Sequence, residues 1–477
     1  MKSRRLLALL LVLTLCMGMM TGCGGSKQGS SSVGSSTASD DEDDPEFNLG
    51  EGDGVSGGSN GTEVPGNSGG SGNSGNSGNT NDSGGSGTAS NSPAAPSSGK
   101  SITVWDFESN TSLLAAVIAY EKATGHKVIV KDHAKTTVND LKMAMMAGTA
   151  PDICNIDNVY LAPCAENGYI REIDTYGAKS NADKFTKVCW DVTQYGGKTY
   201  GMPFDANTLI LAYNKKMMTD ANAKVPTTYA EFIDACAALK AKYPGKYAYT
   251  FPTSNGSTDA VSAFVYFFWL WGFGGDVLKD NNTKAAFNSS EGIKALEAYI
   301  DFVKKGYAPS SYQENNFMNG DNVGMVYFGC WGFNVIYQGN RRGAYDIATL
   351  PVLKTGVPGY SGVGTYCYSV TASSKNPDIA YDFIKYYTMS SAYQLQYCKS
   401  KNFVPTLKEA QKDSFYTSAE WQVVLKQIES AKARPSVKNW DKVEAAVSEA
   451  ISAALKGGLT ATAALDNAAK KVDGYLK

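Results

Sequence analysis

Residues 101–157 read SITVWDFESNTSLLAAVIAYEKATGHKVIVKDHAKTTVNDLKMAMMAGTAPDICNID. Three short runs in this segment are rich in β-branched and other apolar residues, at 102–105, 126–130 and 153–156. Between them, apolar residues recur at the helical period, first around Leu114 and then around Leu141, and a glycine follows each helical segment. Strands that alternate with helices in this way predict an α/β fold with a mostly parallel sheet.

Polar side chains follow two of these predicted strands. Glu108 comes after the first strand and Asp157 after the third. Ligands of parallel sheets bind beyond the carboxyl ends of the strands, so we expect both carboxylates to lie near a binding site. A helix N-cap or a solvated turn is the alternative role for each of them.

The chain after Tyr200 continues with strands and helices. A strand is predicted at 209–212, and helices are predicted at 229–243, 261–270 and 290–304. The last 37 residues form two predicted helices divided by Gly457-Gly458, and Thr460 is suited to cap the second one. The 377 residues after Lys100 exceed what one hydrophobic core usually supports, so we expect two lobes.

The N-terminal segment has the pattern of a bacterial export signal. A basic start at residues 1–5 precedes an apolar run that ends at Thr21-Gly22-Cys23 and is too short for a permanent membrane span. Residues 20–23 resemble a lipobox, in which the cysteine thiol, here that of Cys23, is acylated; Met20 replaces the usual leucine. The alternative is an ordinary secretory signal that happens to contain Cys23.

Residues 24–100 have the composition of a flexible tether. They hold 20 glycines, many serines and asparagines, and ten acidic residues against two lysines. Such a segment cannot bury enough apolar area to offset chain entropy, so we expect it to be disordered. A mucin-like or wall-binding role is the alternative.

Charge and cysteine content exclude several classes of protein. The chain carries 44 Lys and Arg against 46 Asp and Glu, which excludes a polybasic nucleic-acid binder. All 28 Tyr and all 7 Trp lie after residue 100, which excludes disorder there. Seven of the nine cysteines follow Cys23, without the spacing of a metal site, so we expect neither a metal nor a cofactor. The spacing leaves open whether any of the seven form disulfides.

Several short motifs, taken in order, resemble the extracellular solute-binding proteins of ABC importers, in particular the group that binds sugars and oligosaccharides. The motifs are GTAPDI at 148–153, YGMPFD at 200–205, LAYNKK at 211–216, GDNVGM at 320–325, GCW at 329–331, LP at 350–351, SGVG at 361–364 and SSKNPDIA at 373–380. Each motif is weak alone. Their order and spacing together cover nearly all of residues 101–477.

The resemblance implies a two-lobed fold like that of periplasmic binding proteins, with a ligand cleft between lobes that are joined by several chain crossings. We expect these crossings near 205–207, 361–364 and 403–405. Lobe 1 would comprise residues 101–205 plus 362–403, and lobe 2 would comprise residues 206–361 plus 404–477.

The resemblance also implies a function. The protein would be a monomer held by a lipid anchor on the extracellular face of the cell membrane. It would capture a carbohydrate, most simply an oligosaccharide, and deliver it to the permease subunits of an ABC importer. Two alternatives remain: the same fold could bind a polyamine, a peptide or a metal chelate, or it could be a glycan-binding surface module without a role in transport.

Aromatic side chains are expected to stack on sugar rings, whose C–H faces are apolar. Trp331 is the first choice, because it lies between Gly329 and Gly332, where backbone can approach a ligand, and because the family's tryptophan at this place commonly stacks on a sugar. Trp269 and Trp271 stand two residues apart on a predicted helix, so at least one should be buried. Trp440 follows Arg434-Pro435, where the family often places cleft residues. A core position is the alternative for each tryptophan.

Polar contacts are expected at the predicted crossings. Asp205 and Asn207 lie at the first crossing, and Gly364 and Tyr366 lie at the second. Together with Glu108 and Asp157, the carboxylate of Asp205 would accept charge-assisted hydrogen bonds from sugar hydroxyls. Arg434 would donate a fork of N–H groups to hydroxyls, or it would pair with a surface acid instead.

Enzymatic alternatives have little support in the sequence. It contains two histidines, His126 and His133, and neither a nucleophile elbow nor a phosphate-binding loop. Cys330 is a conceivable nucleophile, but nothing places a base near it. Glycoside cleavage would require two of Glu108, Asp157 and Asp205 to flank one bond, with one pKa raised. We therefore expect a binding protein without catalytic residues.

Overall fold

The computed structural model describes residues 99–106, 110–133, 136–251, 263–310, 322–333, 336 and 343–477. The predicted signal with Cys23, nearly all of the predicted tether and the ligand candidate Glu108 lie outside the described residues. Within the described ranges, no helix combines the length and the apolar character needed to cross a membrane.

Five strands form the first sheet, in the order β2, β1, β3, β14 and β6. Their bounds, in that order, are Lys127–Asp132, Ser101–Asp106, Ile153–Asp157, Tyr366–Val370 and Met202–Pro203. β1 runs parallel to β2 and β3, whereas β14 is antiparallel to β3 and to β6. The parallel strands predicted for residues 101–157 are therefore confirmed, and two later strands extend the sheet.

Helices α2 (Thr111–Thr124) and α3 (Val138–Met146) connect the parallel strands. α2 ends where Gly125 adopts a left-handed conformation with φ 73°, which glycine tolerates better than other residues. α3 begins with a capping box, in which the side chains of Thr137 and Asp140 each accept a hydrogen bond from the other residue's backbone N–H. Local signals of this kind place the ends of both helices.

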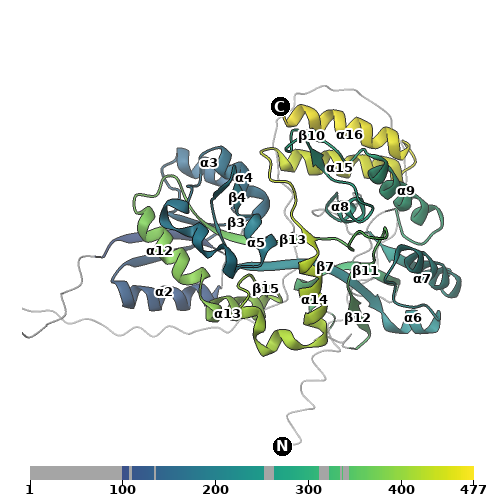
Figure 1. The fold of residues 1–477 in the computed structure, drawn as a ribbon, viewed down its shortest axis with the longest axis horizontal. Coiled ribbons are helices and arrows are strands. Elements are labelled where there is room, and N and C mark those ends of the chain that lie inside the picture. The colour runs from purple at the N-terminus through teal and green to yellow at the C-terminus, as the bar shows by residue number, and fades with distance from the viewer. Residues whose placement is uncertain are drawn as a thin grey trace, which may run out of the picture. The chain divides into compact units, whose positions relative to one another are not determined.

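Five helices confirm the segments predicted after Tyr200: α7 (Tyr229–Lys242), α8 (Ala263–Gly272), α9 (Ser290–Lys304), α15 (Trp440–Leu455) and α16 (Ala461–Tyr475). α8, α9, α15 and α16 pack together beside the second sheet (Figure 1). Among the described residues, the other helices are α4 (Asn158–Glu166), α5 (Lys187–Asp191), α6 (Lys215–Asp220), α12 (Pro377–Thr388), α13 (Ser391–Lys401) and α14 (Ala419–Glu429). Short 3-10 helices lie at Asp174–Tyr176, Ala178–Lys184, Cys330–Gly332, Ala410–Lys412 and Ser414–Thr417, and two small hairpins pair β4 (Gln194–Tyr195) with β5 (Lys198–Thr199) and β9 (Leu278–Lys279) with β10 (Lys284–Ala285).

The second sheet is built around its longest strand, β7 (Asp205–Asn214). β11, β12, β13 and β15 are antiparallel to β7, while β8 pairs in parallel with β11 and β16 in parallel with β13. The bounds of β8, β11, β12, β13, β15 and β16 are Tyr247–Thr250, Val323–Gly329, Tyr345–Ala348, Ser361–Gly364, Val404–Pro405 and Ala431–Lys432. Leu209 and Leu211 enter one core and Ile210 and Ala212 enter another, as expected of a strand buried on both faces.

The chain passes between the two sheets at three places. β6 belongs to the first sheet and β7 to the second; β13 belongs to the second and β14 to the first; and α13, which packs in the core of the first sheet, is followed by β15 of the second. At the crossings Asp205 pairs with Pro405, and Asn207 pairs with Gly364. The three crossings are therefore held side by side by strand pairing, and the predicted fold with several chain crossings is confirmed.

Candidate ligand-binding site

Asp157 stands at the carboxyl end of β3 in the first sheet. Its carboxylate caps α4, because Oδ1 accepts a hydrogen bond of 3.2 Å from the backbone N–H of Val159. Tyr366, the first residue of β14, is its partner in the antiparallel pairing of β3 with β14. Asp157 therefore has the N-cap role that was predicted as the alternative. Its side chain is also 25% exposed and lies near the guanidinium of Arg434.

Arg434 brings a positive charge to this carboxylate from the segment between β16 and α15. Its Nη2 lies 3.8 Å from Oδ1 of Asp157, and its Nη1 lies 3.9 Å from Oε1 of Glu444 on α15. The guanidinium also stacks over the ring of Phe264 on α8, 4.8 Å from the ring centre. Nε is buried and has no hydrogen-bond partner among the described residues. The guanidinium is therefore held in place while one of its donors remains available.

The environment of Glu444 disfavours its charged form. Burial raises the pKa of Glu444, Arg434 opposes that rise, and Asp157 adds to it. Its side chain nevertheless keeps 26% of its surface accessible. The carboxyl group of Glu444 is thus largely surrounded by protein but still accessible in part.

Asp205 is a fully buried carboxyl group at the first crossing. Its Oδ1 accepts a hydrogen bond of 3.2 Å from the backbone N–H of Tyr366, and its Oδ2 has no partner among the described residues. Burial raises its pKa to about 8; the Tyr366 N–H lowers it, and the nearby charges of Asp157 and Asp106 raise it further. The group is therefore largely protonated at neutral pH and has one oxygen left for a ligand.

Asn207 at the first crossing fits against Gly364 at the second. A Cβ on Gly364 would lie 2.3 Å from Oδ1 of Asn207, so the missing side chain is what gives the amide its space. Both residues are partly exposed, as is Tyr366. Burial and the charges of Asp157 and Asp205 raise the pKa of Tyr366, so its hydroxyl stays protonated.

Trp331 lies in a 3-10 helix directly after β11, and it is partly exposed. The expectation that its flanking glycines let backbone approach a ligand is wrong. A Cβ on Gly329 would lie 2.2 Å from the indole of Trp331 itself, and one on Gly332 would lie 2.3 Å from the ring of Phe328. The glycines make room for aromatic rings of the same segment, and that packing fixes the indole.

Trp269, Trp271 and Trp440 lie in the core of the second sheet. Their exposed fractions are 0%, 1% and 3%, so the structure places all three in the packing role and none at a ligand surface. α8 is enclosed by α9, α15 and β13, which buries both faces of the helix that carries Trp269 and Trp271. Trp269 makes edge contacts with Tyr299 and Phe302 of α9.

Glu444 and Phe264 belong to the cluster, and the buried hydroxyl of Ser436 lies two residues after Arg434 in the chain; all three residues are absent from the sequence prediction. Phe264 is one of many aromatic residues in its helix, and Ser436 follows Pro435 without a motif. Glu444 lies beside the apolar stripe of α15, where an acidic residue is typical of an exposed face. No local pattern distinguishes these three side chains from ordinary surface or core residues.

A cavity of about 680 Å³ is lined in part by the residues that directly precede Arg434 in the chain. It is lined by Thr186, Lys187, Val188, Asp191, Lys408, Gln411, Ile428, Glu429, Ala431, Lys432 and Ala433. Ala433 directly precedes Arg434, so the cavity and the cluster are neighbours along the chain. None of the ligand residues predicted from the sequence lines this cavity.

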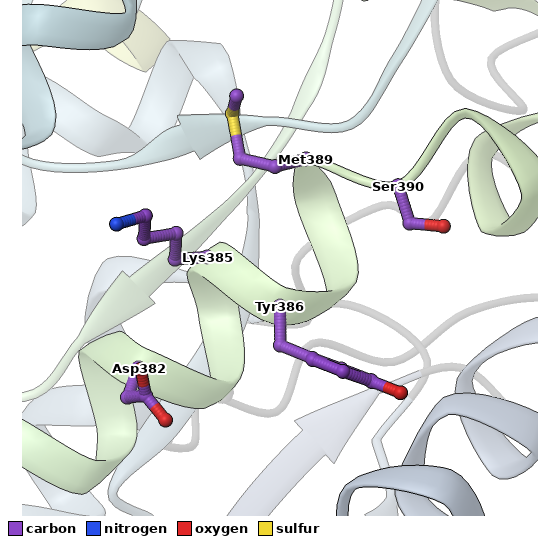
Figure 2. A pocket seen from close by; sticks show the side chains of 5 residues that line it. All are labelled: Asp382, Lys385, Tyr386, Met389 and Ser390. Carbon is purple, nitrogen blue, oxygen red and sulfur yellow. The ribbon is translucent and has the colours of Figure 1, made fainter.

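A second cavity, about 310 Å³, lies where α12 meets α13. Asp382, Lys385, Tyr386, Met389 and Ser390 line it (Figure 2). Lys385 and Tyr386 extend in different directions, so their polar ends do not converge on one point. The hydroxyl of Tyr120 already donates a 2.9 Å hydrogen bond to Asp382. This hollow therefore lacks the convergent polar groups of a specific site.

Comparison with known proteins identifies the family. Residues 115–423 match the model of a family described as bacterial extracellular solute-binding protein. The chain belongs to this family.

Curated relatives of this solute-binding protein include sugar-binding members. It is 25% identical over 404 residues to the galactooligosaccharide-binding protein of Bacillus subtilis (strain 168), covering 80% of this chain and 90% of that one. It is also 25% identical over 383 residues to a maltooligosaccharide ABC transporter solute-binding lipoprotein of Streptococcus pneumoniae, covering 75% and 85% of the two chains.

Solved structures of similar fold support the two-lobed architecture. The cyclic alpha-maltosyl-1,6-maltose binding protein from Arthrobacter globiformis superposes with a TM-score of 0.70 at 24% identity, covering 79% of this chain and 99% of that one. The GacH receptor of Streptomyces glaucescens gives a TM-score of 0.67 at 23% identity, with 79% and 98% coverage. Both likenesses concern the fold.

The structure shows whether the seven cysteines after residue 100 form disulfides, which their spacing leaves open. All seven that follow residue 100 are buried free thiols. Burial raises the pKa of Cys330 to about 12, so this thiol is not an activated nucleophile. The relatives named above are binding proteins, which agrees with a site built for binding.

Proposed function

We propose that this solute-binding protein captures an extracellular carbohydrate, of which an oligosaccharide is the favoured kind, and delivers it to the permease subunits of an ABC importer. The observation that carries the proposal is the meeting of Asp157 and Arg434. These residues come from elements of different sheets, and their polar groups stand next to aromatic rings. Membership of the family and the sugar-binding names of its relatives support the same conclusion.

The chemistry of the cluster suits a sugar. A sugar ring has hydroxyl groups around its rim and apolar C–H faces, so it needs hydrogen-bonding groups beside flat apolar surfaces. Asp157, Asp205 and Arg434 supply acceptors and donors, and the partly exposed ring of Trp331 supplies a surface. The other proposed ligand contacts are Asn207, Gly364 and Tyr366. Glu108 is proposed as a further contact from the sequence alone.

Two lobes would close on the ligand. We assign residues 101–205 plus 362–403 to lobe 1 and residues 206–361 plus 404–477 to lobe 2. The sheet membership of the strands supports this division, apart from β13, which precedes the second crossing. Closure would bend the chain at the three paired crossings, as in other two-lobed binding proteins. Asp157 and Arg434 would then act as facing walls of the cleft.

The proposed setting is the outer face of the cell membrane. Acylation of Cys23 would anchor the chain, and the tether of residues 24–100 would hold a monomeric body clear of the surface. The protein would perform no chemistry, so the carbohydrate would leave the site unaltered.

Calorimetric titration of the purified protein with oligosaccharides, spermidine and short peptides tests the proposal. We expect heat of binding from at least one oligosaccharide and none from spermidine or peptides. Small-angle scattering of the same samples should show a smaller radius of gyration when the sugar is bound. Binding of spermidine or peptides alone, or recovery of a cleaved saccharide, would refute the proposal.

A further inference from the structure

Carboxyl groups outnumber positive charges around Arg434. Asp157 and Glu444 each lie within 4 Å of the guanidinium, at 3.8 Å and 3.9 Å. The charge of Asp157 raises the pKa of the buried Asp205. The positive charge of Arg434 opposes the rise in the pKa of Tyr366 and of Glu444. A single positive charge is therefore shared between two carboxylates.

The lysines of the neighbouring cavity are already engaged within the protein. Lys432 lies 3.8 Å from Asp276 and sits over the rings of Trp271 and Tyr360, at 5.6 Å and 4.9 Å. Lys187 pairs with Asp191, and Lys408 donates a 2.9 Å hydrogen bond to the carbonyl of Asp183. An acidic ligand in the cavity would compete with these internal contacts for the lysine side chains.

The groups that remain unpartnered are suited to uncharged oxygen atoms. Nε of Arg434 and Oγ of Ser436 are buried without hydrogen-bond partners among the described residues. Oδ2 of Asp205, on a side chain with no exposed surface, is a third such group. Hydroxyl and ring oxygens accept from N–H and O–H donors without adding charge, and a protonated carboxyl group donates in the same way.

We infer that Asp157 and Glu444 hold Arg434 between them as a charge-compensated wall of the site, which admits uncharged glycans and rejects glycans that carry a carboxylate. This inference rests on the proposed function and deepens it by naming the class of carbohydrate. Glu444 is a positioning residue, because it acts through Arg434. A ligand carboxylate at this wall would meet two carboxyl groups that already share the adjacent guanidinium, which makes its desolvation unfavourable.

Matched pairs of glycans test the inference on the full chain. The probes are malto-, galacto- and manno-oligosaccharides, each compared by calorimetry with the same oligosaccharide after oxidation of one C6 hydroxyl to a carboxylate. We expect the neutral member of a bound pair to bind at least about tenfold more tightly. Equal or tighter binding of the oxidised member overturns this inference and leaves the proposed function intact. If no glycan binds, the proposed function fails and the inference fails with it.

Substitution of Glu444 tests its role separately from that of the whole site. Glu444→Gln should reduce the preference for the neutral member about threefold or more, because one like charge is removed. Glu449→Gln is the matched control on the same helix, since Glu449 is 66% exposed and pairs with Lys471. Asp157→Asn provides a second variant that retains an N-cap residue. A preference unchanged in both site variants overturns the inference, because a merely structural role would not alter the ratio of two affinities.

Discussion

The carboxylate of Asp157 caps helix α4 and at the same time lies 3.8 Å from the guanidinium of Arg434. The cap fixes the carboxylate at the end of the first sheet, and the stacking on Phe264 fixes the guanidinium beside the second. Each partner is thus oriented by its own surroundings before the two meet. An arrangement of this kind reduces the entropy that a ligand must remove when it binds between them.

Arg434→Lys should weaken carbohydrate binding about tenfold or more, although the positive charge is kept. The ammonium group of lysine is compact and not planar, so it cannot stack on the ring of Phe264. It also lacks the rigid fork of N–H donors with which the guanidinium lies near two carboxylates. Calorimetry with the best-bound oligosaccharide measures the change.

Arg171→Lys is the control for this substitution. Arg171 donates to the carbonyls of Thr371, Ala372 and Ser374, remote from the cluster, so its replacement should lower the melting temperature and leave the Kd unchanged. An Arg434→Lys variant that binds like the wild type would remove Arg434 from the site.

Trp331→Ala should weaken carbohydrate binding by roughly 2–4 kcal/mol, the scale of an aromatic hot spot. The indole is partly exposed and is held by packing over Gly329, so its loss removes a preformed surface. Titration calorimetry of the variant gives the difference in binding free energy, and circular dichroism checks that it is folded. A normal fold together with an unchanged Kd would contradict this role.

Trp269→Ala should destabilise the protein by about 3–5 kcal/mol, because it removes a fully buried side chain from a dense aromatic core. Trp269→Phe should cost much less, since a ring remains to face Tyr299 and Phe302. Denaturant unfolding measures both variants. If Trp269→Ala left stability intact but abolished sugar binding, the packing role assigned here would be wrong.

The stability of the protein should fall as the pH rises from about 4 to about 8, through Asp205. The folded-state pKa of about 8 lies above the ordinary value of 3.8, so the folded protein retains a proton that the unfolded chain releases. The contribution is complete below the unfolded-state pKa and is lost as the pH approaches the folded-state value, at about 1 kcal/mol per pH unit. Chemical denaturation across this range measures the slope.

Asp205→Asn should flatten that pH dependence, because the amide does not titrate. The comparison of slopes between wild type and variant isolates Asp205 from the other ionisable groups of the chain. Parallel slopes in the two proteins would show that Asp205 is ionised in the folded state.

The seven buried thiols should be silent towards Ellman's reagent in the folded protein and should all react after denaturation. Burial raises the pKa of Cys164 and Cys189 to about 12 and also raises that of Cys154 and Cys236, so almost no thiolate is present at neutral pH. Fewer than seven reactive thiols in denaturant without reductant would reveal a disulfide and contradict the free-thiol state.

The sequence predicted the secondary structure well because the signals are local. Gly125 ends α2, Thr460 caps α16, and the unbroken apolar run Leu209–Ala212 marks a strand. Each of these signals depends on residues within one or two turns of the chain. The same locality explains the error at Trp331, since the glycines beside it gave no indication of which ring fills their space.

The candidate site was predicted only in part. Asp157 follows a predicted strand, and Arg434 lies beside a proline at a place where the resemblance implies cleft residues. Glu444 and Phe264 carry no such signal, and their role depends on how α15 and α8 pack against the second sheet. The burial of both Trp269 and Trp271 has the same origin, because a helix enclosed on all sides has no exposed face.

The order of strands and helices follows from the sequence itself, because the hydrophobic period, the helix caps and the glycines that end helices act between near neighbours. The short motifs of the sequence also indicate the family. The tertiary structure decided which residues surround Arg434. Asp157, Phe264 and Glu444 are far apart in the chain, and only the crossing of the strands and the packing of the helices bring their charges and rings within contact distance.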